Sequence, residues 1–183
     1  MPKKIVILNG SPRRNGNTSA LVKKFTEGAE SAGNTVTEFF LDEMDIHGCK
    51  GCFGGHSSSA CPCVQRDDMG KIYPAIKDCD VVVLASPLYY WNLSGQLRMA
   101  IDRLFALEEG DGNLLRGHGR ASALLMSAEG HGFADVLLYY DHLLEHLNWK
   151  NLGHVLAGGN GDAGDIGGKT ELQNAYTLGK SIE

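Results

Sequence analysis

The chain lacks the features that define several classes of protein. Its 183 residues contain no run near the ~20 apolar residues that a membrane-spanning helix needs. The apolar stretch after its first lysines is too short for a signal peptide. It has no long basic run and carries a formal net charge of −5, which argues against nucleic acid or an anionic membrane as its main partner. Internal repeats and an interdomain linker are also missing, so we expect one domain over residues 1–183.

Cysteine is scarce outside one short segment. The chain has five cysteines, an odd number, and four of them lie between Cys49 and Cys63. Such a cluster suits a reducing compartment better than a disulfide scaffold, so we expect a cytoplasmic protein. Cys49, Cys52, Cys61 and Cys63 suffice in number for an iron–sulfur cluster or a structural zinc. Their spacing, C-x2-C-x8-C-x-C, leaves free thiols or a reversible Cys pair as the alternative.

Apolar runs alternate with amphipathic segments along the chain. The apolar runs predict five strands, at residues 5–8, 36–41, 81–85, 121–126 and 154–157. Apolar residues at helical spacing lie between these strands and predict helices, and a last helix is expected at about residues 170–180. This alternation implies right-handed crossovers and a doubly wound parallel sheet, which binds ligands at the carboxyl ends of its strands.

The loop after the first strand is the strongest candidate for a binding site. Residues 9–19 are Asn-Gly-Ser-Pro-Arg-Arg-Asn-Gly-Asn-Thr-Ser, between a strand and an amphipathic helix. Unpaired N–H groups and the positive end of a helix dipole meet at such a junction and attract phosphate. The glycines match neither the dinucleotide nor the nucleoside-triphosphate pattern, so we expect a monophosphate. The alternative is a polar turn with ordinary helix capping.

Two further loops are expected beside the first. Residues 86–95, after the third strand, include the consecutive aromatics Tyr89, Tyr90 and Trp91, which suit stacking on a planar ligand. A sheet edge or dimer interface covered by these aromatics is the alternative. The small, glycine-rich loop at residues 127–132 could bring backbone atoms to the polar edge of the same ring.

Two motifs are better explained without their usual chemistry. Residues 142–146 match H-x-x-E-H, but their segment already carries a core stripe, so a solvated helix face is expected. Residues 159–164 match G-x-G-x-x-G but follow the last strand, with no room for the acidic residue about twenty positions on. We expect that segment to be a loop near the ligand or at a subunit contact.

Taken together, several segments resemble a known family. They are residues 10–19, 49–53, 63–69, 86–91, 95–97 and 101–104. They resemble the NADPH-dependent FMN reductase / iron–sulfur flavoprotein branch of the flavodoxin-like superfamily. The resemblance runs from the first strand through about Leu104, and more loosely to residues 164–166. It implies a flavodoxin-like α/β fold, a five-stranded parallel sheet in the order 2-1-3-4-5 with helices on both faces and FMN at its carboxyl edge.

The resemblance also implies which residues bind FMN. The phosphate is expected at Ser11, Arg13, Asn15, Asn17, Thr18 and Ser19. The isoalloxazine is expected at Pro87, Leu88, Tyr89, Tyr90, Trp91 and Asn92, with its other edge closed by Ala128, Glu129 and Gly130. Family members commonly form dimers or tetramers in which a neighbour completes the flavin site, so a homodimer or homotetramer is expected.

The function implied is an FMN-dependent NAD(P)H oxidoreductase. Hydride passes from NAD(P)H to FMN, and electrons pass on to a small-molecule or protein acceptor. Because the cofactor performs the chemistry, we nominate no catalytic acid or base. One alternative is an electron carrier with a 4Fe-4S cluster at Cys49, Cys52, Cys61 and Cys63, although residues 53–56 lack the third cysteine usual in such relatives. The other is a non-catalytic flavin-binding redox sensor.

Overall fold

A computed structural model describes residues 1–55, 62–109 and 112–183. It contains a five-stranded parallel sheet in the order β2-β1-β3-β4-β5, as predicted. The strands are β1 (Lys4–Asn9), β2 (Thr35–Phe40), β3 (Val81–Pro87), β4 (Ala121–Ser127) and β5 (Lys150–Ala157). The helices are α1 (Asn17–Ser31), α2 (Met69–Asp78), α3 (Gly95–Glu108), α4 (Ala134–Leu147) and α5 (Thr170–Lys180), with a 3₁₀ turn, η1 (Leu41–Glu43).

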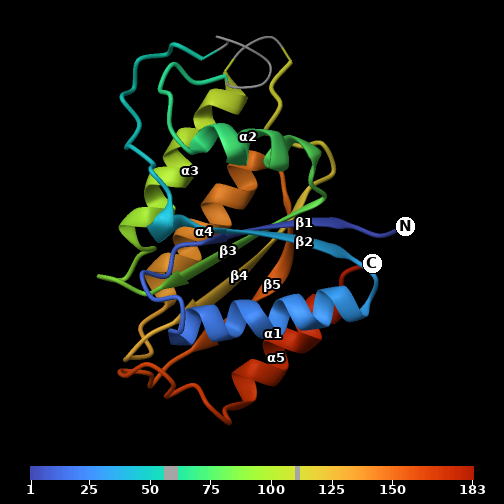
Figure 1. Ribbon diagram of the computed structural model, residues 1–183, viewed down its shortest axis with the longest axis vertical. Helices are drawn as coiled ribbons and strands as arrows, with labels where there is room; N and C mark the ends of the chain where they lie inside the picture. Colours follow the sequence, from blue (N-terminus) through green and yellow to red (C-terminus); the bar gives the residue numbers. More distant parts are fainter. Residues whose placement is uncertain (56–61, 110–111) are drawn as a thin grey trace.

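Helices cover both faces of the sheet. Figure 1 shows α1 and α5 on one face and α2, α3 and α4 on the other. In β3, Val81 and Val83 belong to the core on the α1 and α5 side, whereas Val82 and Leu84 belong to the opposite core. A strand buried on both faces needs apolar residues at every position, which explains the continuous run at residues 81–85.

The strand at the edge of the sheet is longer than predicted. β5 begins at Lys150, whereas the apolar pattern placed its start at His154. Its first two residues are exposed, and the register with β4 shifts between Ser122 and Leu124. An edge strand that faces solvent does not need a continuous apolar run, so its polar first half gave no signal.

The segment before α2, which carries the cysteines, is fixed by a buried ion pair. The Arg103 guanidinium donates to the Asp67 carboxylate at 2.5 and 3.0 Å, and both side chains are 1% exposed. The same Nη1 donates to the carbonyl of His47 at 2.8 Å. Arg103 therefore fastens both ends of the segment from His47 to Asp67 onto α3.

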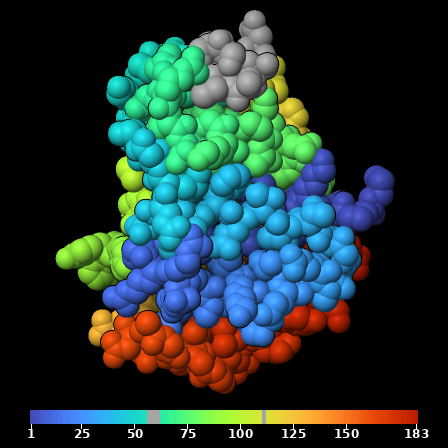
Figure 2. Space-filling view, in the orientation of Figure 1, coloured from blue at the N-terminus to red at the C-terminus, as the bar shows by residue number. Residues whose placement is uncertain are grey.

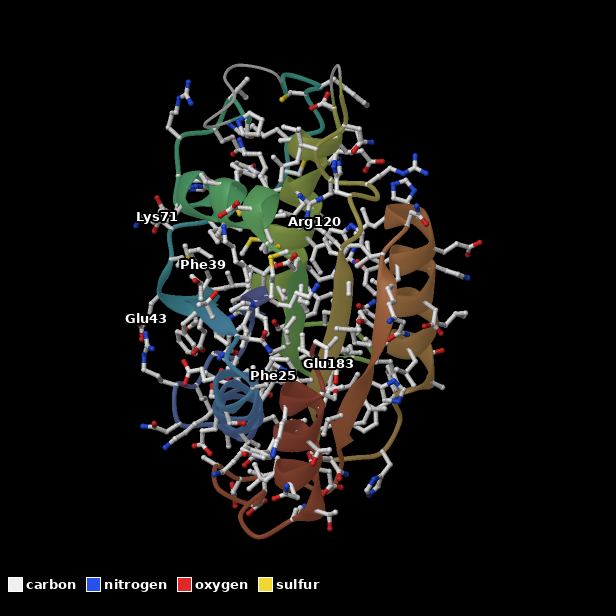
Figure 3. The ribbon with its side chains drawn as sticks, turned by 90° about the vertical axis from the view of Figure 1, so that its right-hand side faces the viewer. Phe25, Phe39, Glu43, Lys71, Arg120 and Glu183 are labelled. Carbon is white, nitrogen blue, oxygen red and sulfur yellow. The ribbon has the colours of Figure 1, made fainter. Side chains whose placement is uncertain are left out.

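Of the other charged side chains described, Arg120 is also buried, whereas the exposed ones lie at the periphery. Figure 3 shows Phe25 in the interior and Glu43 and Lys71 at the outer edge. Over the described parts of the chain, no helix is both long and apolar enough to cross a membrane.

Candidate functional site

The loops that follow the strands gather at one edge of the sheet, on the left of Figure 1. Between them lies a cavity of about 240 Å³. Four loops contribute to its wall: the β1–α1, β3–α3, β4–α4 and β5–α5 loops. Its lining consists of Ser11, Pro12, Arg13, Gly16, Asn17, Thr18, Pro87, Leu88, Tyr89, Ser127, Ala128, Glu129, Asn160 and Gly161.

The start of α1 offers the cavity a row of unpaired donors. No described residue accepts a hydrogen bond from the backbone amides of Asn17, Thr18 or Ser19. Gly16 is the N-cap residue, and no side chain caps this helix, so the alternative of ordinary capping by Asn17 or Thr18 is wrong. Three free amides at the positive end of a helix dipole are an arrangement that binds phosphate.

Two adjacent arginines have different surroundings. Arg13 lines the cavity, and its guanidinium makes no hydrogen bond or ion pair with the described residues. Arg14 instead forms an ion pair with Glu43, its Nε 2.8 Å from Oε1, and lies over the Phe40 ring at 4.4 Å. Hydrogen bonding from Arg14 lowers the pKa of Glu43. Of these two arginines, only Arg13 is therefore available to an anion in the cavity.

Hydroxyl groups shape the β1–α1 loop. Ser11 Oγ donates to the Arg13 carbonyl at 2.9 Å and accepts from the Arg13 amide at 3.2 Å. Ser19 Oγ donates to the same carbonyl at 2.9 Å. The Thr18 hydroxyl has no partner in the described residues and lines the cavity. Asn15 is exposed and, like Ser19, lies outside the lining.

The β1–α1 loop packs directly against the start of α3. A Cβ on Gly10 would lie 2.6 Å from Ser94 Oγ and 2.7 Å from Leu97 Cβ, so only glycine fits there. Ser94 Oγ donates to the Gly10 carbonyl at 2.7 Å, and the Ser94 amide donates to Ser86 Oγ at 2.8 Å. Ser94 also caps α3 by accepting from the Leu97 amide at 3.4 Å. The link to Gly10 joins residues 84 positions apart and was not predicted from the sequence.

The aromatic loop forms a tight projecting turn. The amides and carbonyls of Tyr89 and Asn92 exchange two hydrogen bonds of 3.0 Å. Between them Tyr90 and Trp91 adopt φ values of 45° and 60°, a region that bulky residues rarely enter. Tyr90 is 94% exposed and Trp91 is 60% exposed. The loop between β3 and α3 projects on the left of Figures 1 and 2. Of its aromatics, only Tyr89 lines the cavity.

The last two loops are joined by backbone hydrogen bonds. The Ala128 amide donates to the Ala157 carbonyl at 2.9 Å, and the Asn160 amide donates to the Ala128 carbonyl at 2.9 Å. The Gly159 amide donates to the Glu129 carbonyl at 3.0 Å. The amides of Glu129 and Gly130 have no acceptor within the described chain. They remain available to a ligand, although Gly130 itself lies outside the lining.

The cavity therefore unites most of the predicted site. The predicted residues that line it are Ser11, Arg13, Asn17, Thr18, Pro87, Leu88, Tyr89, Ala128 and Glu129. The predicted residues outside its lining are Asn15, Ser19, Tyr90, Trp91, Asn92 and Gly130. The lining also includes five residues that were not named individually from the sequence: Pro12, Gly16, Ser127, Asn160 and Gly161. The last two lie in the segment at residues 159–164, which was expected to be a loop near the ligand or at a subunit contact.

The cysteine segment lies away from this cavity. Phe53 packs edge-to-face on Phe105, with ring centroids 5.9 Å apart, and the Gly55 amide donates to Glu109 at 3.1 Å. These contacts place it at the carboxyl end of α3, about 20 Å along the helix from the cavity. Cys49 and Cys52 are exposed and Cys63 is buried, whereas Cys61 lies outside the described residues.

Over the described ranges, no three His, Cys, Asp or Glu side chains are grouped so that they could hold a metal. The four-cysteine site stays a prediction because one of its members lies outside those ranges. Cys79 is a core residue, and burial raises the pKa of its thiol to about 11.

The strand order and a cavity built on a helix N-terminus define a flavodoxin-like α/β protein with a site suited to a phosphorylated ligand. Residues 3–163 match the NADPH-dependent FMN reductase family, and the chain belongs to it. An iron-sulfur flavoprotein of Archaeoglobus fulgidus is 31% identical over 98% of this chain and 78% of its own length. These findings make the chain an NAD(P)H-dependent FMN oxidoreductase.

Solved structures share the fold at low sequence identity. RosB, with bound 8-demethyl-8-formylriboflavin-5′-phosphate, superposes with a TM-score of 0.75 at 19% identity, over 97% of this chain and 75% of that one. The NAD(P)H:quinone oxidoreductase from Methanothermobacter marburgensis gives 0.73 at 17% identity, over 98% and 96%. At these identities the similarity establishes the fold.

Proposed function

We propose that the cavity holds FMN, with its phosphate at the start of α1 and its ring beside the β3–α3 and β4–α4 loops. The observation that carries this proposal is the row of free amides at Asn17, Thr18 and Ser19, next to the unpaired Arg13 guanidinium. Charge-assisted hydrogen bonds from these groups match a phosphate dianion. The residues present therefore fit the cofactor.

The remaining walls suit the rest of the molecule. Pro87, Leu88 and Tyr89 give one side of the cavity an apolar and aromatic surface, and the Glu129 amide provides a donor on the other. Bound FMN supplies the ring that takes hydride from NAD(P)H and passes electrons to an acceptor. The chain's own residues bind and orient that ring, and none of them is assigned as an acid or base.

A second copy of the chain is the partner that we expect at the flavin site. Tyr90 and Trp91 are exposed large aromatics on a strained turn next to the cavity, and such strain persists at sites with a functional role. Burial against a second protomer would remove this surface from water. A homodimer or homotetramer is thus proposed, with a small-molecule or protein electron acceptor. A cytoplasmic location fits the exposed thiols of Cys49 and Cys52.

An iron–sulfur electron carrier is the second candidate. It is favoured by the Arg103–Asp67 pair, which fixes both ends of the cysteine segment, and by the name of the Archaeoglobus relative. The cysteine segment lies ~20 Å from the cavity along α3, so a carrier would have to pass electrons over that distance. Iron and acid-labile sulfide analysis of anaerobically purified protein decides this. Four iron and four sulfide per protomer would support the electron carrier, whereas the absence of both would support the reductase.

Titration of the flavin-free protein with FMN and with riboflavin tests the proposed binding mode. If the phosphate sits at the start of α1, FMN binds at least tenfold more tightly than riboflavin, since it adds charge-assisted hydrogen bonds of about 1.5–3 kcal/mol. Inorganic phosphate then competes with FMN and not with riboflavin. Equal affinity for both flavins contradicts the assignment. Failure to bind either one favours a redox sensor that reports through its thiols.

A further inference from the structure

The side chain of Asn17 bonds to a segment near the other end of the chain. Its Nδ2 donates to the Asp162 carbonyl at 2.8 Å. Its Oδ1 accepts from the amides of Gly164 at 3.0 Å and Ile166 at 3.4 Å. One carboxamide thus uses both its donor and its acceptor functions on the β5–α5 loop, residues 158–168. What Asn17 leaves for a ligand is its backbone amide.

Lys169 holds the same loop from its other end. Its ammonium donates to the carbonyls of Gly158 at 3.2 Å and Gly159 at 2.7 Å, and to Asn160 Oδ1 at 2.7 Å. No described carboxylate forms an ion pair with it. Lys169 is the N-cap residue of α5, where the helix dipole opposes a positive charge. The three oxygen contacts explain its position better than any contribution to α5 does.

Together these bonds fix a wall of the cavity. Asn160 and Gly161, which follow the turn bonded by Lys169, belong to the cavity lining, and Asp162 is the residue bonded by Asn17. The Gly161 amide has no acceptor in the described chain. A Cβ on Gly161 would lie 3.9 Å from Glu129 Cγ, so this wall adjoins the β4–α4 loop.

We propose that Asn17 and Lys169 are positioning residues that hold the β5–α5 loop against the flavin, where the Gly161 amide contacts the part of the cofactor beyond its phosphate. This proposal rests on FMN binding in the cavity. In this proposal the Asn17 side chain holds the β5–α5 loop by hydrogen bonds and is not a ligand of the phosphate. Its backbone amide still faces the phosphate site.

The test compares affinities for FMN and riboflavin, because riboflavin lacks the phosphate. Asn17→Ala and Lys169→Met should each weaken both flavins by the same factor, about tenfold for the loss of two or three hydrogen bonds. The matched controls are Asn151→Ala and Lys180→Met. Asn151 accepts from the Gly153 amide at 2.8 Å at the opposite end of β5, so both controls should bind both flavins as wild type does.

Amide hydrogen exchange gives a second readout that needs no flavin. In Asn17→Ala, the amides of Gly164 and Ile166 should exchange about tenfold faster than in wild type, because they lose their acceptor. If Asn17→Ala does not fold, Lys169→Met tests the same loop from α5. Weakened FMN binding with unchanged riboflavin binding in Asn17→Ala would make Asn17 a direct phosphate ligand and overturn the proposal. Unchanged affinity for both flavins in both variants would also overturn it.

Arg13→Ala separates this proposal from the one it depends on. If Arg13→Ala loses affinity for FMN alone while Asn17→Ala loses affinity for both flavins, both proposals are supported. If Arg13→Ala binds FMN as wild type does, the phosphate assignment fails. The exchange rates of Gly164 and Ile166 would still report whether Asn17 holds the loop.

Discussion

Replacing Asp67 by asparagine removes the negative charge that compensates a buried arginine. The Arg103 side chain is 1% exposed, and its Nη1 and Nη2 both donate to Asp67, at 2.5 and 3.0 Å. Breaking a buried pair at one partner costs about 3–5 kcal/mol. Because asparagine keeps one acceptor oxygen, we expect a loss at the low end of this range, about 3 kcal/mol of unfolding free energy. In a chain of this size that loss lowers the melting temperature by roughly 6–12 °C.

Differential scanning calorimetry at neutral pH measures this effect, and the neighbouring residue supplies the control. Asp68 pairs with Lys71 at 2.6 Å, but the Lys71 side chain is 69% exposed. Asp68→Asn should therefore cost below about 1 kcal/mol, or less than about 4 °C. Asp67→Leu combined with Arg103→Met removes both charges and should recover most of the loss. An Asp67→Asn protein that melts like Asp68→Asn would refute the reasoning.

The same pair predicts a pH dependence. Burial is the largest single influence and raises the pKa of Asp67, but the hydrogen bonds from Arg103 and from the amides of His47 and Met69, together with the Arg103 charge, outweigh it and hold the pKa below the ordinary 3.8. The stabilisation is then fully present above pH 3.8 and is lost as the pH falls through the folded-state pKa. The difference in melting temperature between wild type and Asp67→Asn should stay constant from about pH 8 to 5 and shrink below 3.8.

Three more predictions concern the flavin site. Arg13→Ala should weaken FMN binding at least tenfold by fluorescence titration, the loss of about 1.5 kcal/mol, whereas Arg14→Ala, whose arginine pairs with a glutamate, should bind like wild type. Gly10→Ala should cost about 1–3 kcal/mol in urea unfolding, since its new Cβ would lie 2.6 Å from a serine oxygen. Gly95→Ala, with nothing within 4 Å, should not destabilise the chain. Trp91→Ala should shift the protein toward monomer in sedimentation velocity, and an unchanged oligomer would count against the proposed contact.

The sheet was predictable where its strands are central. The unbroken apolar run at residues 81–85 of β3 and the mostly apolar sequence of β4 follow from burial on both faces. The loops after the strands then had to meet at one edge. The polar first half of β5 was not predictable in this way, because an edge strand is paired on one side only and half exposed. This first half is a strand because it pairs with β4, and such pairing cannot be inferred from the local sequence.

The site was predictable in its local parts. The loop before α1 has the strand, glycines and helix start that leave amides free, and these features are contiguous in the sequence. The loop at residues 159–164 was expected near the ligand or at a subunit contact, but Asn160 and Gly161 were not singled out, because their position depends on Asn17, more than a hundred residues away in the chain. The contact between Arg103 and Asp67 was also not predicted, because the two residues lie 36 positions apart and meet only in the folded chain. Both lie in segments that carried the family resemblance.

The central claim is that the chain binds FMN and reduces it with NAD(P)H. The most direct test is an anaerobic absorbance spectrum of protein loaded with FMN and freed of excess, recorded before and after NADPH is added. The account predicts retained flavin with a band near ~450 nm that NADPH bleaches. Protein that retains no flavin, or a bound flavin that neither NADPH nor NADH bleaches, would contradict it.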